Sequence, residues 1–264
     1  MSIRNRRSTS IPEGGSNSVI HEEKYVLPPV SDEQLNVVHS ISDDKNVIVD
    51  SVAGSGKTTN IMYIAALMEN INILVLTYNA KLKEETRYKI DELGLGNVEA
   101  HGYHSFCKKY YDNSCITDKG ILNTVDNNLS PLRPLSFQLI IVDEGQDMNP
   151  TYFQLVKKAY RDTSTNEGNG PQFCILGDKY QSIYSFNDAD SRFIEYADSL
   201  FNFDDREWVH CKLSTSYRLT SGMSNFLNEV VLKEDRMRVI KDGPKVRYAV
   251  LNQWNDQSFF EFKR

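Results

Sequence analysis

Val47-Ile48-Val49-Asp50-Ser51-Val52-Ala53-Gly54-Ser55-Gly56-Lys57-Thr58-Thr59 is the stretch that decides the fold. An apolar run, a loop of small residues and a helix-like segment at 61–68 predict a strand, a phosphate-binding loop and a helix. Backbone N–H groups at the start of that helix would bind an anion. Lys57 would reach the β- and γ-phosphates of a nucleoside triphosphate, and the Thr58 hydroxyl would ligate Mg²⁺. Because Ser51 stands where the G-x-x-x-x-G-K-[ST] pattern has glycine, the alternative is a plain turn with a surface lysine.

A second apolar run, at 139–142, ends in two adjacent carboxylates, Asp143 and Glu144. Such a run is typical of a strand buried in a parallel sheet. Asp143 would complete the Mg²⁺ shell begun by Thr58, and Glu144 would orient and polarise the attacking water. Further strands are expected at 73–76, 98–100 and 173–176, and helices at 31–40, 80–93, 151–160 and 222–232. This order predicts an α/β fold with a mostly parallel central sheet flanked by helices.

Net charge, cysteine spacing and the distribution of apolar residues limit the classes of protein to which the chain can belong. The net charge of −6 excludes a surface that is basic throughout, so nucleic-acid contacts would come from a local groove. The four cysteines form no C-x-x-C pair, which predicts neither a zinc site nor disulfides and favours a reducing, intracellular compartment, cytoplasm or nucleus. Polar residues interrupt the most apolar stretch, 61–78, and residues 1–18 contain no apolar segment. We therefore expect no membrane span and no signal peptide.

Two stretches differ from the rest of the chain. Residues 1–27 contain three arginines and many polar residues, and we expect a flexible tail. The tail is either simply solvated or serves nuclear targeting or nucleic-acid binding. Residues 107–137 are polar and are expected to form a small insertion or a long loop. A last strand-like run occupies 245–251.

Polar and aromatic residues follow two of the predicted strands. Thr77, Tyr78 and Asn79 end one, and Tyr103 and His104 follow another. Strand ends in an open α/β sheet are where ligands bind, and such groups suit stacking on bases and bonding to phosphate. The alternative for the second group is a half-buried aromatic cluster.

Gln34 lies three residues after Ser31, a predicted helix N-cap. Its amide both donates and accepts, so it can pair with the N6 and N7 edge of adenine. The alternative is an ordinary residue on the helix surface.

The order of these motifs resembles the UvrD/Rep/PcrA family of superfamily 1 DNA helicases over residues 28–232. The matching residues are Gln34, 53–59, 77–79, Tyr103-His104-Ser105-Phe106, Asp143-Glu144-Gly145-Gln146-Asp147, Gly177-Asp178, Gln181-Ser182-Ile183-Tyr184 and Tyr217-Arg218.

The resemblance implies a RecA-like motor that binds ATP and Mg²⁺ and contacts single-stranded DNA or a single/double-strand junction. The implied catalytic residues are Lys57, Asp143, Glu144, Gln181 as the γ-phosphate sensor, and Arg218 as an arginine finger. The implied ATP-binding residues are Gln34, Ala53, Gly54, Ser55, Gly56, Lys57, Thr58, Thr59 and Tyr217, with Thr58 and Asp143 on the metal. The implied DNA contacts are Thr77, Tyr78, Asn79, Tyr103, His104, Tyr184 and Phe186.

The resemblance also implies a division of the chain. Residues 28–213 would form the first motor domain, 1A, with a short 1B-like insertion at 107–137. Residues 214–264 would form a hinge and an incomplete second domain, 2A. Asn187-Asp188-Ala189-Asp190 replaces the Arg-Gly-Ala-Asp common in the family. No segment matches motifs V and VI, which a missing C-terminal region or a partner chain would supply.

Three functions fit these observations. The first is an ATP-dependent DNA translocase or helicase of which this chain is the N-terminal motor half. The second is an ATP-binding switch or scaffold without autonomous unwinding. The third, an RNA helicase of the same superfamily, is disfavoured by the Asp-Glu-Gly-Gln-Asp signature at 143–147.

Overall fold

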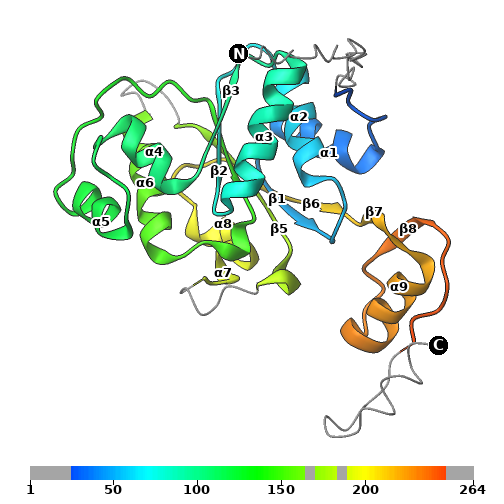
Figure 1. Ribbon diagram of the computed structural model, residues 1–264. Helices are drawn as coiled ribbons and strands as arrows, with labels where there is room; N and C mark the ends of the chain where they lie inside the picture. The colour runs from blue at the N-terminus through cyan, green and yellow to red at the C-terminus, as the bar shows by residue number, and fades with distance from the viewer. Residues whose placement is uncertain (1–24, 164–169, 183–188, 248–264) are drawn as a thin grey trace, which may run out of the picture.

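The computed structural model describes residues 25–163, 170–182 and 189–247 (Figure 1). In chain order the elements are α1 (Asp32–Ser42), β1 (Asn46–Ser51), α2 (Lys57–Leu67), β2 (Ile73–Thr77), α3 (Ala80–Leu93), β3 (Val98–His101), α4 (Tyr103–Tyr110), α5 (Asp118–Asp126), β4 (Leu139–Asp143), η1 (Gly145–Asp147), α6 (Pro150–Thr163), β5 (Gln172–Gly177), η2 (Lys179–Gln181), α7 (Arg192–Glu195), α8 (Ala197–Leu200), β6 (Trp208–Leu213), β7 (Thr215–Thr220), α9 (Ser221–Phe226), the π-helical turn η4 (Leu227–Leu232) and β8 (Arg238–Lys241).

Six strands form one sheet in the order β3-β2-β4-β5-β1-β6. Every neighbouring pair is parallel, which confirms the predicted α/β class with a parallel central sheet. Strands β2, β4 and β5 are buried at every position because helices cover both faces of the sheet there. The sheet order brings the ends of β1, β4 and β5 to one edge, where ligands bind in this kind of fold.

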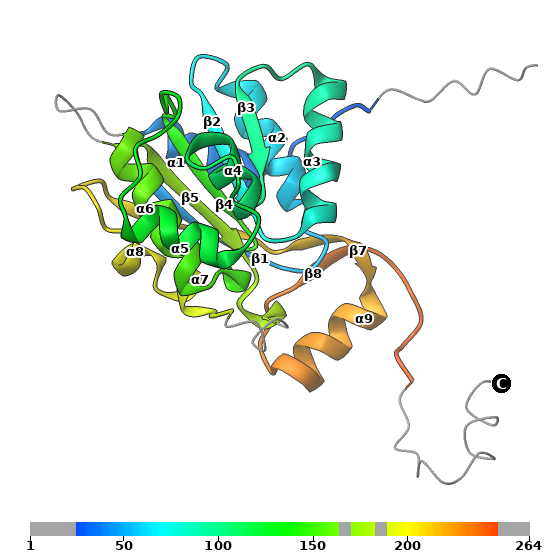
Figure 2. The ribbon, with the colours of Figure 1, turned by 60° about the vertical axis from the view of Figure 1, so that its left-hand side comes forward.

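Alternate side chains of the strands enter two separate cores, as the pleat of a strand requires. Val47 and Val49 of β1 pack in one core with α1, α2 and α3, whereas Ile48 packs in the other with α4 to α8. Figure 2 shows these two groups of helices on opposite faces of the sheet. The result is a three-layer domain that holds the strand ends, and the loops after them, in fixed positions.

The helix boundaries follow from their caps. Ser31 caps α1 in a capping box with Gln34, and Asn79 caps α3, whose last turn ends at Gly94 in the left-handed region. These caps satisfy N–H and C=O groups that the helices leave unpaired.

The C-terminal segment, which we define as residues 214–241, leaves the large sheet after β6. Its strand β7 pairs in parallel with β8, and α9 and η4 lie between them in sequence (Figure 1). Apolar side chains are exposed on this segment: Met223 (46%), Val230 (49%), Val231 (55%) and Ile240 (67%).

Two expectations about the fold need correction. Residues 107–137 do not form a long loop, because they contain the end of α4 and all of α5, and Ile121 and Thr124 of α5 are buried. The other alternative, a small insertion, stays a prediction. Residues 245–247 are not in a strand, and 248–251 lie outside the described residues. The strand of that region is β8, earlier in the chain.

All four cysteines are free and buried. The predicted tail at 1–27 lies almost wholly outside the described residues. Of the helices that the structure describes, none has the length and apolar character needed to cross a membrane.

Candidate nucleotide site and the adjoining aromatic cavity

The loop between β1 and α2 is shaped by two glycines. Gly54 and Gly56 have φ of +73° and +84°, a region that residues with a Cβ rarely adopt. The carbonyl groups of Ala53 and Gly54 accept hydrogen bonds from the Ser216 hydroxyl (2.7 Å) and the Tyr217 N–H (2.9 Å). These oxygens, which would repel phosphate, are therefore turned toward β7, and the loop leads into the N-terminus of α2.

Lys57 and Glu144 meet at the end of the sheet. The Lys57 Nζ lies 3.2 Å from Glu144 Oε1, and Gln146 Nε2 donates to Glu144 Oε2 at 2.9 Å. Glu144 itself has φ of 56°, a left-handed conformation that costs a non-glycine residue about 1–3 kcal/mol and is found at functional sites. The backbone and Gln146 thus fix the Glu144 carboxylate beside the phosphate-binding loop.

Three carboxylates, Asp143, Glu144 and Asp147, lie close to Lys57. Asp143 is 2% exposed; burial and the neighbouring Glu144 raise its pKa, while Lys57 opposes the shift. Burial and Glu144 also raise the pKa of Asp147 to about 7. The Asp147 Oδ1 atom is buried and has no hydrogen-bond partner among the described residues. This excess of buried negative charge fits a site that binds a divalent cation.

The opposite wall comes from the C-terminal segment. A cavity of about 300 Å³ is lined by the phosphate-binding loop on one side and by Tyr217 and Arg218 of β7 on the other. Its lining residues are Gly54, Ser55, Gly56, Lys57, Thr58, Thr59, Leu82, Glu85, Lys89, Glu144, Tyr217 and Arg218. A Cβ on Gly54 would lie 2.5 Å from the Arg218 Cβ, so glycine is what allows β7 to approach the loop. The site is therefore built from both parts of the chain.

Several predicted site residues lie outside that cavity lining. Gln34 is 3% exposed, and its Oε1 accepts from the Ser31 N–H at 3.0 Å in the capping box. An ideal Cβ on Gly56 would lie 3.2 Å from the Gln34 Nε2, so the amide end of Gln34 is next to the loop. The Gln181 Nε2 donates to Asp178 Oδ2 at 2.6 Å instead of facing the cavity.

A second cavity, of about 480 Å³, lies beside the ends of β2 and β3. Its lining residues are Tyr78, Asn79, Ala80, Lys83, Gly102, Tyr103, His104, Ser105 and Tyr152. We call it the aromatic cavity. Thr77 is 1% exposed and does not line it, and Tyr184 and Phe186 lie outside the described residues.

The Tyr103 ring is already stacked. It is 3% exposed and lies parallel to Tyr152, with 4.3 Å between ring centroids and 2° between the planes. Asp118 joins the cluster by accepting from the Tyr152 hydroxyl at 3.0 Å and contacting His104 Nε2 at 2.8 Å. Tyr103 therefore supports the wall of the aromatic cavity. The more accessible side chain beside it is that of His104.

Tyr152 and Lys83 are lining residues that the sequence did not single out. Tyr152 lies on the face of α6 that packs against the sheet. Its spacing from the other apolar residues of the helix is that of a core residue. Lys83 lies in the first turn of α3, directly after Thr77-Tyr78-Asn79, and that proximity to a predicted contact is the signal that could have found it.

The parallel three-layer fold, the glycine loop and the strand-end carboxylates define a P-loop nucleoside-triphosphatase domain of the RecA-like type. The AAA domain family matches residues 34–187, more than half of the chain. The chain belongs to this family, which is one of nucleotide-binding domains.

Its curated relatives include proteins named as ATP-dependent DNA helicases, in agreement with the resemblance stated above. The chain is 27% identical over 236 residues to the ATP-dependent DNA helicase PcrA of Staphylococcus aureus, covering 83% of this chain and 30% of that protein. It is 34% identical over 98 residues to the ATP-dependent DNA helicase UvrD1 of Mycobacterium bovis, covering 37% and 12%. It is 29% identical over 138 residues to the RecBCD enzyme subunit RecB of Chlamydia muridarum, covering 52% and 12%.

The chain thus spans about a third or less of the length of these relatives.

Among solved structures, it is similar to one of two coordinating Pif1 helicases at forked double-stranded DNA. The TM-score is 0.47 and the identity 18%, and the match covers 76% of this chain and 48% of that chain. A second is Pif1 helicase from Candida albicans, with a TM-score of 0.46, 15% identity and coverage of 70% and 40%.

Proposed function

We propose that this chain is the ATP-binding motor part of an ATP-dependent DNA helicase or translocase. One observation supports this most: Lys57 and Glu144 are paired at 3.2 Å on one wall of a cavity whose other wall carries Arg218. Phosphoryl transfer needs a cation on the phosphates, a group that orients the attacking water, and charge stabilisation at the γ-phosphate. These three side chains supply those functions.

Binding of ATP would separate the ion pair. The Lys57 ammonium would turn from Glu144 to the β- and γ-phosphates, and the loop N–H groups and the α2 dipole would add to the attraction. Glu144, still held by the Gln146 amide, would then accept a hydrogen bond from water and orient it toward the γ-phosphorus. Arg218 would stabilise the charge that develops on the γ-phosphate oxygens.

Thr58 and Asp143 are the residues that would hold Mg²⁺. A hydroxyl and a carboxylate are oxygen donors of the kind that this ion prefers, and the buried carboxylates around Lys57 leave negative charge to be neutralised. The ion would neutralise phosphate charge in the transition state.

Single-stranded DNA would pass over the aromatic cavity. Tyr78, Asn79 and His104 offer a ring, an amide and an imidazole at the strand ends, and Lys83 adds a cation. Each base stacked on an aromatic side chain contributes about 1–3 kcal/mol to binding. Tyr103, stacked on Tyr152, would hold this surface in place.

The test is ATP hydrolysis by the chain with and without oligo(dT), in the presence of Mg²⁺ or EDTA. We expect DNA-stimulated phosphate release that EDTA abolishes, and a fall of about 10²–10⁴-fold in Glu144→Gln. Glu69→Gln, the same change at an exposed position after α2, is the control and is expected to keep full activity. Binding of ATP without turnover would instead favour an ATP-binding switch, and an absence of binding would refute the proposal.

A further inference from the structure

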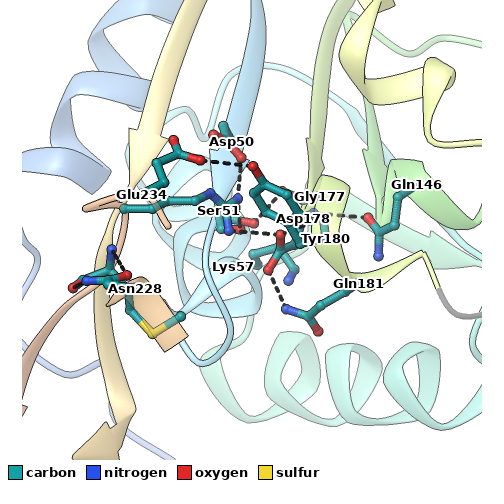
Figure 3. Close-up of polar contacts among 12 residues, drawn as sticks. Asp50, Ser51, Lys57, Gln146, Gly177, Asp178, Tyr180, Gln181, Asn228 and Glu234 are labelled. Carbon is teal, nitrogen blue, oxygen red and sulfur yellow. Dashed lines mark hydrogen bonds and ion pairs between the residues drawn. The ribbon is translucent and has the colours of Figure 1, made fainter. Parts of the chain in front are cut away.

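Arg236, in the turn between η4 and β8, is the side chain that connects the C-terminal segment to the ends of two central strands. Its side chain is only 6% exposed. Its Nη2 donates to Asp50 Oδ1 at 2.5 Å and to the Ser51 carbonyl at 3.0 Å, and its Nη1 lies 3.0 Å from Asp178 Oδ1. Figure 3 shows Asp50, Ser51 and Asp178 close to one another.

This ion pair is a poor source of stability. Removing a guanidinium from water costs several kcal/mol, which paired carboxylates in general only about balance. The Nε of Arg236 is buried, and no hydrogen-bond partner for it occurs in the described parts of the chain. An arginine retained in such a place suggests a role in position rather than in stability, because its planar fork fixes several acceptors relative to one another.

The two oxygens of Asp178 face Arg236 and Gln181, and Oδ1 also accepts from the Tyr180 backbone N–H at 3.0 Å. Oδ1 faces Arg236, whereas Oδ2 accepts from the Gln181 amide at 2.6 Å (Figure 3). The Asp178 N–H in turn donates to Gln146 Oε1 at 3.1 Å, and Gln146 Nε2 holds Glu144. A continuous hydrogen-bonded path therefore joins Glu144 at the nucleotide site to Arg236 on the C-terminal segment, with Gln181 attached to its middle.

Tyr180 closes this arrangement from the solvent side. Its ring lies 5.0 Å from the Arg236 guanidinium carbon, and its hydroxyl donates to Glu234 Oε2 at 2.9 Å. Tyr180 and Gln181 are neighbours in η2. The turn that carries the predicted γ-phosphate sensor is thus in contact with the C-terminal segment through both residues 234 and 236.

We propose that Arg236 is a positioning residue that controls the release of Gln181 from Asp178. Asp178 is 3% exposed, so its charge needs a partner. With Arg236 in place, Gln181 can leave for the γ-phosphate without stranding a buried carboxylate. Without Arg236, Asp178 would retain the Gln181 amide as its remaining side-chain donor. The position of the C-terminal segment would thereby decide whether Gln181 is available. This inference rests on the proposed function.

The variant that tests it is Arg236→Met, which keeps much of the length and removes the charge. Nucleotide binding is followed with a fluorescent ATP analogue, and turnover with and without oligo(dT). We expect the DNA-stimulated rate to fall about 10-fold while nucleotide affinity stays within about 3-fold. Arg236→Lys, which restores a charge but not the fork, is expected to recover part of the loss. Arg238→Met, the same change at an exposed position two residues on, is the control.

Two double variants separate positioning from general support. Adding Arg236→Met to Gln181→Ala is expected to lower the rate no further, because both changes act on one step. Asp178→Asn, which removes the charge that retains Gln181, is expected to restore part of the rate lost in Arg236→Met. Multiplicative losses, or a parallel fall in nucleotide affinity and thermal midpoint, would show that Arg236 only supports the structure.

Other outcomes are also decisive. If Arg236→Met does not fold, Arg236→Lys is used as the test variant. An unchanged DNA-stimulated rate in Arg236→Lys would overturn the inference. If the wild-type chain binds nucleotide without turnover, the turnover rate cannot serve as the readout. Amide hydrogen exchange at residues 214–241, measured with and without nucleotide, is then used in its place. A nucleotide-induced change that persists unaltered in Arg236→Met or Arg236→Lys would then refute it. A wild-type chain that does not bind ATP would refute the proposed function before any variant is compared.

Discussion

The large sheet and the C-terminal segment are stabilised in different ways. The sheet has six strands with helices packed on both of its faces, and residues such as Ile175 are fully buried. The C-terminal segment has two strands, and Ile240 is 67% exposed in it. Isolated two-stranded structures are marginal in water, so contacts with the large sheet must place this segment.

Those contacts are mainly polar. Glu33 of α1 accepts from the Ser214 and Thr215 N–H groups, the Ser216 hydroxyl donates to Ala53, and Arg236 bridges two strand ends. Polar contacts can exchange partners at little net cost, whereas a packed core cannot shift without loss of contact. The comparison indicates a rigid half of the nucleotide site and a half that is able to move.

The largest expected effect tests whether the movable half is catalytic. Arg218→Ala should lower ATP turnover by about 10³–10⁵-fold, since an arginine finger contributes in that range, while nucleotide affinity changes little. Lys57→Ala, in the rigid half, should weaken both affinity and turnover. Steady-state hydrolysis and nucleotide titration measure the two quantities. A rate within tenfold of wild type in Arg218→Ala would show that Arg218 of the C-terminal segment takes no part in ATP hydrolysis.

A matched pair of isoleucines measures the difference in packing directly. Ile175→Ala should destabilise the protein by about 2–5 kcal/mol because it leaves a cavity in the core. Ile240→Ala should change the free energy of unfolding by less than about 0.5 kcal/mol. Urea titration followed by circular dichroism gives both values. Equal losses would mean that the C-terminal segment has a core comparable to that of the sheet.

The connection between the two regions should be sensitive to Glu33. Its carboxylate accepts from Ser214 N–H at 2.9 Å, Thr215 N–H at 3.3 Å and the Ser214 hydroxyl. Glu33→Gln should cost about 1 kcal/mol, because it removes charge-assisted hydrogen bonds, and should speed amide exchange at these two residues about fivefold.

Asp32→Asn is the matched control for this prediction. It removes a charge from the same first helical turn at an exposed position. If it accelerates exchange at Ser214 and Thr215 as much as Glu33→Gln, the helix charge and not the direct contact is responsible.

The smallest effect is expected at β3, the first strand in the order of the large sheet. A hydrogen bond from His101, aided by Lys109 and Tyr110, lowers the pKa of Glu99 to about 2 from an ordinary value of 4.5. The resulting stability is fully present above pH 4.5 and is lost as the pH falls toward 2. Because the Glu99 side chain is 39% exposed, screening limits it to about 1 kcal/mol.

Glu99→Gln should therefore flatten the acid side of the stability profile. Urea midpoints at pH 3 and pH 6 should lie closer together in this variant than in wild type. An unchanged difference would mean that other carboxylates dominate acid unfolding.

Short-range patterns in the sequence predicted the large sheet and the rigid half of the site. The run 47–59 contains a strand, a loop and a helix start in one stretch, and Asp143 and Glu144 directly follow a buried run. Strand β6 was missed because it is last in the sheet order beside β1 and exposes alternate residues such as His210. His210 and Lys212 interrupt it, so it lacks the continuous apolar run by which the buried strands were recognised.

The contacts between the two regions could not be predicted. Arg236 lies in a charged turn, and its partners Asp50 and Asp178 are distant in the sequence. Tyr152 has the spacing of a core residue, and its stacking on Tyr103 arises from the packing of α6 on the sheet. Such pairings are set by tertiary structure and leave no local pattern.

The capping box of α1 has a consequence for the choice of base. The Gln34 Oε1 accepts from both the Ser31 N–H at 3.0 Å and the Ser31 hydroxyl at 3.2 Å, which uses its two lone pairs and leaves the amide hydrogens for a purine. They can donate to N7, which adenine and guanine share, but the oxygen that would recognise the N6 amino group of adenine is engaged. As long as the box is closed, we expect the protein to accept GTP nearly as readily as ATP.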